Sequence, residues 1–211
     1  ITMPFAIASI LLLIFYNYAY IIFNSGNYLK FIYETPLILI VLSVSTIFFG
    51  WFFKTVLIGK YKPGVKPLWS TFVWRNEFVN SISENLVYPF FEFMFLGTPF
   101  APIYFRIMGC KIGEKVFMET TEITEFDLVT IGSESVLNFG CTIQTHLFED
   151  RVMKMSYINI GKACTIGSLS VILYDTRMQD HSLLQGLSLI MKGETLPENT
   201  KWHGSPCQLQ N

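Results

Sequence analysis

The sequence predicts a membrane-spanning helical hairpin followed, after a connecting amphipathic helix, by an all-β domain built as a parallel β-helix. Three observations support this fold class. Two long stretches near the N-terminus carry no charge. Apolar residues recur at every sixth position through the C-terminal half, and small residues precede most of them by two positions. A mean hydropathy of +0.42 with 15% charged residues is too apolar for an ordinary soluble domain of 211 residues.

Residues 1–59 are predicted to form a two-helix transmembrane anchor. Residues 3–23 are almost continuously apolar and residues 35–53 are uncharged, so each stretch is long enough to cross a hydrocarbon core of about 30 Å as a helix. A signal peptide would have a basic start and would not be followed at once by a second apolar stretch. Four lysines crowd the end of the second stretch: Lys54, Lys60, Lys62 and Lys66. The positive-inside rule therefore predicts that both termini and the β-helix are cytoplasmic.

Residues 60–110 are predicted to connect the anchor to the β-helix domain. The mixture of proline, glycine and lysine in residues 60–67 is typical of a linker that breaks helices. Residues 69–95 mix aromatic and charged residues, which indicates an amphipathic helix lying along the bilayer or over the next domain. A buried core helix fits the same pattern. Pro89 should interrupt this helix, and Gly97-Thr98-Pro99 should end it.

The β-helix domain, residues 111–211, is predicted from a period of six. The apolar positions are Ile131, Leu137, Ile143, Ile160, Ile166, Ile172, Met178, Leu184, Ile190, Leu196 and Trp202. The small positions are Ser135, Cys141, Cys164, Ser170, Thr176, Ser182, Ser188 and Thr200. A period of six fits neither an amphipathic helix nor a simple meander, but it fits a coil of three short strands. Large residues would fill the prism, and Gly132, Gly161 and Gly167 would relieve strain at its corners.

Composition excludes several classes of function. A net charge of −1 and a pI near 6.3 provide no basic stripe for phosphates, so nucleic acid is not an expected partner. The four cysteines are widely spaced without a C-x-x-C pair, which we interpret as reduced thiols rather than a metal site. Motifs typical of serine hydrolases, P-loop kinases and dinucleotide-dependent dehydrogenases are missing from the sequence.

Five strings together with the hexads resemble a known family. They are Gly97-Thr98-Pro99, Asp127-Leu128-Val129-Thr130-Ile131-Gly132, His146-Leu147-Phe148-Glu149-Asp150-Arg151, Ser188-Leu189-Ile190-Met191-Lys192-Gly193-Glu194 and Trp202-His203-Gly204-Ser205-Pro206. The hexads resemble the hexapeptide-repeat acyltransferases. The strings look like the C-terminal membrane region of nonribosomal-peptide-synthetase-like enzymes of the ε-poly-lysine synthetase type. The resemblance implies a left-handed β-helix, which six-residue spacing alone does not fix because crossovers are normally right-handed.

The resemblance also implies a reaction and its partners. It implies a membrane-anchored acyltransferase that joins an aminoacyl thioester to an amine acceptor. The donor would be the phosphopantetheine thioester of a carrier protein, with no covalently bound cofactor. Implied partners are the membrane, a carrier protein, an adenylation domain and two further β-helix domains in a trimer or pseudo-trimer. Two alternatives stay open: an O- or N-acetyltransferase that uses acetyl-coenzyme A, and a β-helix scaffold without catalytic activity.

The hexad register fails once inside the prism, between Ile143 and Ile160. Residues 144–157 are too many for two hexads and too few for three, so a loop should bulge from the β-helix there. This loop contains the densest polar cluster of the domain, namely His146, Glu149, Asp150, Arg151 and Lys154. Functional side chains concentrate on loops held by a rigid scaffold. The loop is therefore the predicted active site, although a solvated turn with an acid-to-arginine pair would show the same residues.

His146 is the predicted general base, because imidazole suits proton abstraction near neutral pH and the resembled enzymes use a loop histidine for direct transfer. Glu149 or Asp150 would orient its second nitrogen or hold an ammonium group. Arg151 would bind a carboxylate, and Lys154 would contribute to substrate binding.

The C-terminal tail is predicted to bind the donor. In the resembled enzymes a similar Gly-x-Pro-Ala tail borders the channel for the pantetheine arm, and here Cys207 replaces the usual alanine. The predicted donor-binding residues are Lys192, Trp202, Gly204 and Pro206. His181 falls in a regular hexad and is predicted to be a surface histidine.

Overall fold

The computed structural model describes residues 2–26 and 28–210 and divides into two compact units. We call them the helical unit and the β-helix unit. The helical unit comprises Ile1–Leu57 and Arg75–Met94, and the β-helix unit comprises Ile58–Trp74 and Phe95–Asn211. The region predicted to connect the two parts, residues 60–110, is thus shared between both units instead of forming a segment of its own.

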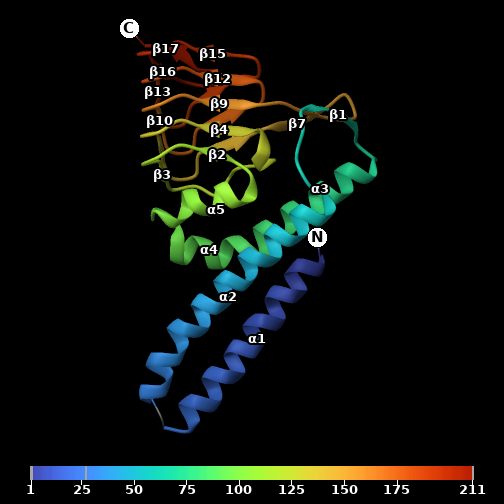
Figure 1. Ribbon diagram of the computed structural model, residues 1–211, viewed down its shortest axis with the longest axis vertical. Helices are drawn as coiled ribbons and strands as arrows, with labels where there is room; N and C mark the ends of the chain where they lie inside the picture. Colours follow the sequence, from blue (N-terminus) through green and yellow to red (C-terminus); the bar gives the residue numbers. More distant parts are fainter. Residues whose placement is uncertain (1, 27, 211) are drawn as a thin grey trace. The chain divides into compact units, whose positions relative to one another are not determined.

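In the helical unit, α1 (Thr2–Asn24) and α2 (Tyr28–Leu57) run side by side (Figure 1). The Tyr18 hydroxyl donates a hydrogen bond of 2.5 Å to Glu34, which ties the two helices together near their connection. By length and composition, α2 is the one helix among the described residues that can cross a membrane. In α1, the apolar residues whose side chains are described form the stretch Leu12–Asn24. The first predicted span lies partly outside the residues whose side chains are described, so it stays a prediction.

The region predicted to form one amphipathic helix is divided into three helical segments. These are α3 (Thr71–Ile82), a π-helical turn η1 (Ser83–Val87) and α4 (Tyr88–Phe95). Pro89 lies in the first turn of α4, directly after the π-helical turn, so the helix changes its hydrogen-bond pattern at the proline instead of ending there. Val87 is fully buried, and a Cβ at Gly50 of α2 would lie 2.9 Å from its side chain. In the helical unit the π-helical turn η1 therefore packs against α2, as a buried core helix would.

The coils of the β-helix unit stack so that their strands form three parallel sheets (Figure 1). The first two sheets have a parallel strand in five coils and the third in three. The first face holds β2 (Lys111–Ile112), β4 (Val129–Ile131), β9 (Ile158–Ile160), β12 (Thr176–Met178) and β15 (Thr195–Leu196). The second holds β3 (Phe117–Met118), β5 (Val136–Leu137), β10 (Thr165–Ile166), β13 (Leu183–Leu184) and β16 (Lys201–His203). The third holds β6 (Thr142–Gln144), β11 (Val171–Leu173) and β14 (Leu189–Ile190). The predicted parallel β-helix with one hexad per face is confirmed.

The hexad residues build the core as predicted. All of the eleven apolar positions except Trp202, which is half-buried, are at most 2% exposed. Burial of each such side chain contributes about 1.5–3 kcal/mol. The small residues join successive coils: the Ser135 hydroxyl donates to the carbonyl of Gly161 at 2.9 Å, and that of Ser170 donates to Gln185 at 2.7 Å. A larger side chain there would both overfill the turn and lose this bond.

The predicted role of the three hexad glycines is wrong. None of them adopts the left-handed backbone conformation of a strained corner. A Cβ at Gly132 would lie 2.4 Å from the carbonyl oxygen of Gly161, and one at Gly167 would lie 2.2 Å from the nitrogen of Gly186. Glycine is therefore required because successive coils approach too closely for any side chain. The left-handed corner is taken two residues later, for example at Ala163 with φ 50°.

Both ends of the prism are covered. At the first coil, α5 (Phe100–Met108) packs its buried Phe105 against Phe126 of η2 (Phe126–Leu128), with ring centroids 6.1 Å apart. At the last coil, β17 (Gln208–Leu209) folds back antiparallel on β16. The helix α5 was not predicted, because the sequence analysis ended the helical region at Gly97-Thr98-Pro99.

The break in register contains a β-hairpin rather than a loop. It consists of β7 (His146–Glu149) and β8 (Val152–Met155), joined by a two-residue turn. Both turn residues, Asp150 and Arg151, have positive φ (51° and 62°), as a tight hairpin of this length requires. The predicted linker also contains a strand, β1 (Gly64–Pro67), which pairs antiparallel with β8. In the resulting three-stranded sheet β8 is the central strand, and β1 and β7 are the edges.

Candidate active site

His146 is the first residue of β7, and it is buried. Its side chain is 9% exposed, and its Nδ1 lies 2.8 Å from Oε2 of Glu125. Its ring also meets that of Phe148 at a centroid distance of 5.1 Å. The break in the hexad register predicts a loop at His146. The structure places it where the hairpin joins the prism, because β7 pairs with β8 from its first residue onward.

Glu125 is the functional candidate that the sequence analysis missed. It is fully buried and adopts a left-handed conformation (φ 37°, ψ 63°) that non-glycine residues rarely occupy. Its Oε2 also accepts a hydrogen bond from the Thr145 hydroxyl at 2.5 Å. The signal in the sequence is a second register break, because Ile123 and Ile131 occupy successive faces but lie eight residues apart.

This arrangement determines the chemistry available to the imidazole. An ionised carboxylate only accepts hydrogen bonds, so with Glu125 ionised Nδ1 of His146 donates the hydrogen bond and the lone pair lies on Nε2. The same carboxylate stabilises the positive charge that forms when Nε2 takes up a proton. Glu149 and Asp150 do not orient the imidazole as expected. Side chains at odd separations along a strand point to opposite faces, so Glu149 faces away from His146 on β7.

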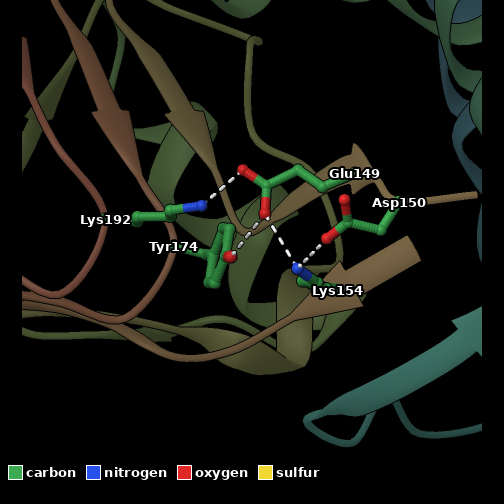
Figure 2. A network of polar contacts seen from close by, with 5 residues as sticks. All are labelled: Glu149, Asp150, Lys154, Tyr174 and Lys192. Carbon is green, nitrogen blue, oxygen red and sulfur yellow. Dashed lines mark hydrogen bonds and ion pairs between the residues drawn. The ribbon is translucent and has the colours of Figure 1, made fainter. Parts of the chain in front are cut away.

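The remaining charged residues of the hairpin form a network with the prism (Figure 2). Lys192 approaches one carboxylate oxygen of Glu149 at 2.5 Å, and Lys154 approaches the other at 3.2 Å. Lys154 also contacts Asp150 at 3.0 Å, and the Tyr174 hydroxyl lies 3.5 Å from Glu149. Tyr174 follows β11 and Lys192 follows β14, so the network ties the tip of the hairpin to the corners of two successive coils.

The network shifts the titration of its members. Hydrogen bonds from Lys192 and then from Lys154 hold the pKa of Glu149 below its ordinary value. Contacts with Asp150 and then Glu149 raise the pKa of Lys154, and Glu149 raises the pKa of Lys192. Glu149, Lys154 and Lys192 are therefore charged at neutral pH. Because they are partly exposed, their attraction is screened by salt.

The other predicted site residues lie in two further places. Arg151 is exposed at the turn, where its carbonyl accepts a hydrogen bond from the Leu68 amide at 3.0 Å. In the tail, the indole of Trp202 donates to Thr200 at 2.8 Å, and the Gly204 amide donates to the Ser188 hydroxyl at 3.1 Å.

Within the tail, Pro206 follows Gly204 by two residues, and burial raises the pKa of the next residue, Cys207, to about 11. Lys192 belongs to the hairpin network and not to this tail. His181 is exposed, as predicted.

Comparison with known proteins identifies a relative by sequence. No protein-family model matches the chain. Delta-poly-L-ornithine synthetase from Acinetobacter baumannii (strain AB307-0294) is 43% identical over 154 residues, which cover 73% of this chain. They cover 12% of the synthetase, so the chain corresponds to a small part of that protein.

Several solved structures are similar at low identity. A hexapeptide-repeat acetyltransferase from Vibrio cholerae in complex with acetyl-coenzyme A has a TM-score of 0.43 and 18% identity, covering 49% of this chain and 60% of its own. A galactoside acetyltransferase in complex with coenzyme A has a TM-score of 0.44 and 19% identity, covering 52% and 68%. The resemblance predicted from the sequence is confirmed: the chain is a hexapeptide-repeat protein related to one segment of a poly-amino-acid synthetase.

Proposed function

We propose that the β-helix unit is an acyltransferase domain of a poly-amino-acid synthetase, with His146 as its general base. The observation that carries this proposal is the buried pair of His146 and Glu125, in which a fully buried carboxyl group holds one nitrogen of an imidazole. The relative with 43% identity supports the substrate class, because its name describes a polymer of an amino acid. The left-handed winding of the coils, implied by the family resemblance, belongs to this proposal.

The proposed reaction forms an amide bond from a thioester. The amine of the acceptor attacks the carbonyl carbon of an aminoacyl group that a carrier protein holds on phosphopantetheine. The nitrogen–carbon bond forms, the carbon–sulfur bond breaks, and the nitrogen loses one proton to Nε2 of His146. The protonated imidazole then returns this proton to the thiolate that leaves. Glu125 is a positioning residue, since it holds the ring and stabilises its positive charge.

The hairpin and the tail have separate proposed roles. Glu149 and Asp150, held by Lys154 and Lys192, keep the hairpin against the prism so that His146 stays in place. Arg151 presents an exposed guanidinium at the turn, suited to a carboxylate of the substrate or the carrier protein. Trp202, Gly204 and Pro206 remain the proposed contacts for the pantetheine arm.

We also propose that the domain works with two further β-helix domains, in one chain or between chains. Exposed apolar side chains form a ridge along one corner of the prism: Phe139, Leu169 and Leu187 are 63%, 54% and 71% exposed. They lie on successive coils, since the Leu169 amide bonds to the carbonyl of Phe139 and the Leu187 amide to that of Ser168. Such a ridge is typical of an interface. We further propose that the helical anchor lies in the cytoplasmic membrane and that the prism lies in the cytoplasm.

The test uses the full-length synthetase with its adenylation and carrier domains. His146→Gln should leave loading of the carrier unchanged and lower the transfer rate about 10²- to 10⁴-fold, the usual contribution of a general base. His181→Gln is the matched control and should retain activity. If His146→Gln transfers at the wild-type rate, the proposal is wrong. If the wild-type protein acetylates an acceptor from acetyl-coenzyme A without a loaded carrier, the alternative function, that of a coenzyme-A-dependent acetyltransferase, replaces the proposed one.

A further inference from the structure

The helix α5 exposes an apolar stripe. Its buried side packs on the first coil through residues that are at most 3% exposed: Ala101, Tyr104, Phe105 and Met108. On its other side Phe100, Ile103 and Ile107 are 59%, 45% and 52% exposed. These positions, i, i+3 and i+7, form one stripe along a helix. A helix on the surface of a soluble domain would carry polar residues there, so this stripe requires an apolar environment.

A pocket of about 570 Å³ lies beside the stripe, between α5 and the first coil. Its apolar lining includes Pro99, Ile103 and Phe117, and its polar lining includes Arg106 and Lys115. The Gly97-Thr98-Pro99 turn also lines it, and the Gly97 amide bonds to the carbonyl of Met118 at 2.9 Å. The pocket therefore combines an apolar wall with two cations, and its shape is fixed by the attachment of this turn to β3.

The cations of the pocket are available to an anion. The Arg106 guanidinium is held by two neutral carbonyls, those of Ile112 (3.0 Å) and Gly113. Within residues 2–26 and 28–210 it has no carboxylate partner. Lys115 pairs with Glu134 at 3.6 Å, but both side chains are more than 60% exposed, and such pairs contribute little.

We propose that α5 lies in the membrane interface and that its pocket binds the headgroup of an anionic phospholipid. The apolar stripe would enter the acyl region, while Arg106 and Lys115 contact the phosphate, which is the arrangement of an interfacial amphipathic helix. Two observations favour lipid over a protein partner. The charge of the pocket complements a phosphate, and only five residues separate Phe100 from Met94, the end of the unit that contains the candidate span α2. This inference does not depend on acyl transfer.

The insertion of α5 is tested with an environment-sensitive fluorophore on the whole chain in lipid nanodiscs. The label is attached at Ile103→Cys, and Leu209→Cys is the control, since Leu209 is 52% exposed on β17 at the other end of the prism. The native cysteines are buried. Lipids with a quencher in the acyl chain should quench the label at position 103 several-fold more than the label at 209. Equal quenching would overturn the proposal. Protection from an aqueous quencher without lipid quenching would also overturn it, in favour of a protein partner.

The choice of headgroup is tested with Lys115→Gln, because Arg106 also holds the first coil. Nanodiscs of phosphatidylcholine are compared with nanodiscs in which one third is phosphatidylglycerol. Lipid quenching at position 103 should increase with phosphatidylglycerol, and Lys115→Gln should remove about half of this increase. Lys162→Gln, an exposed lysine on a regular coil, should retain it. Identical quenching in both lipid mixtures would show that the pocket does not select an anionic headgroup.

Discussion

The regular coils and the β7–β8 hairpin are stabilised in different ways, although both belong to the β-helix unit. Each coil repeats one local pattern, in which a buried aliphatic residue and a small residue contact the same positions of the next coil. The hairpin depends on partners far away in the sequence: β1 on its edge, Glu125 at its base, and Tyr174 and Lys192 beside its tip. The scaffold is thus built by repetition, and the site is built where repetition stops.

This difference has an energetic consequence. The coils are held by apolar burial and backbone hydrogen bonds, neither of which responds to pH in the neutral range. The tip of the hairpin is also held against the prism by partly exposed charges, which respond to both pH and salt. Each region should therefore fail under a different perturbation.

The largest expected effect on stability comes from truncating the core of a coil. Ile166 is fully buried in the prism, so Ile166→Ala should lower the free energy of unfolding by about 2–5 kcal/mol, through lost burial and the cavity left behind. Lys162→Ala, four residues earlier, removes an exposed side chain and should change the free energy of unfolding by less than about 0.5 kcal/mol. Denaturant titration of the chain in detergent measures both. Equal effects would show that the prism is not close-packed at Ile166.

An intermediate effect is expected at the base of the hairpin. Glu125→Gln keeps the shape of the side chain but removes the charge that faces His146 and Thr145. The transfer rate should fall about 10-fold or more, less than for His146→Gln, because the imidazole remains but loses the group that orients it. The control is Glu122→Gln, which changes an exposed acidic residue three positions earlier. A rate unchanged by Glu125→Gln would remove Glu125 from the site.

The smallest effect is expected in the network at the hairpin tip. The pKa of Glu149 is lowered in the folded protein. Its contribution to the stability of the hairpin is therefore present above the ordinary glutamate pKa of 4.5 and is lost as pH falls through the folded-state pKa. The pKa values of Lys154 and Lys192 are raised in the folded protein. Their contribution to the stability of the hairpin is therefore present below the ordinary lysine pKa of 10.5 and is lost as pH rises through the folded-state values. Amide exchange in the hairpin should therefore quicken relative to the coils below about pH 4.5 and above about pH 10.5.

Substitution isolates the same network at neutral pH. Lys192→Met should quicken amide exchange in β7 and β8 several-fold and leave the coils unchanged, because one of the two lysines on Glu149 is lost. The control is Glu134→Gln, which breaks an exposed ion pair on a regular coil. High salt should reproduce the effect of Lys192→Met. If exchange in the hairpin is the same in both variants, β1 alone holds the hairpin.

The comparison also explains what the sequence could predict. The period of six located the buried residues of every coil from Ile131 to Leu196, because each face of the prism is one hexad. The break after Ile143 located the hairpin. The partners of the hairpin could not be predicted, since Glu125 and Lys192 are distant in sequence and meet His146 and Glu149 only through folding. Strand β1 escaped prediction because its structure comes from pairing with β8 and not from its own residues.

The central claim, that His146 is a general base held by Glu125, is tested most directly by single-turnover transfer from a loaded carrier as a function of pH. In the full-length wild-type protein the rate should rise across the range in which imidazoles titrate, around pH 6–7. His146→Gln should abolish this rise and lower the rate about 10²- to 10⁴-fold, with the carrier still fully loaded. A variant that keeps the wild-type rise in rate would contradict the claim and move the base to another residue.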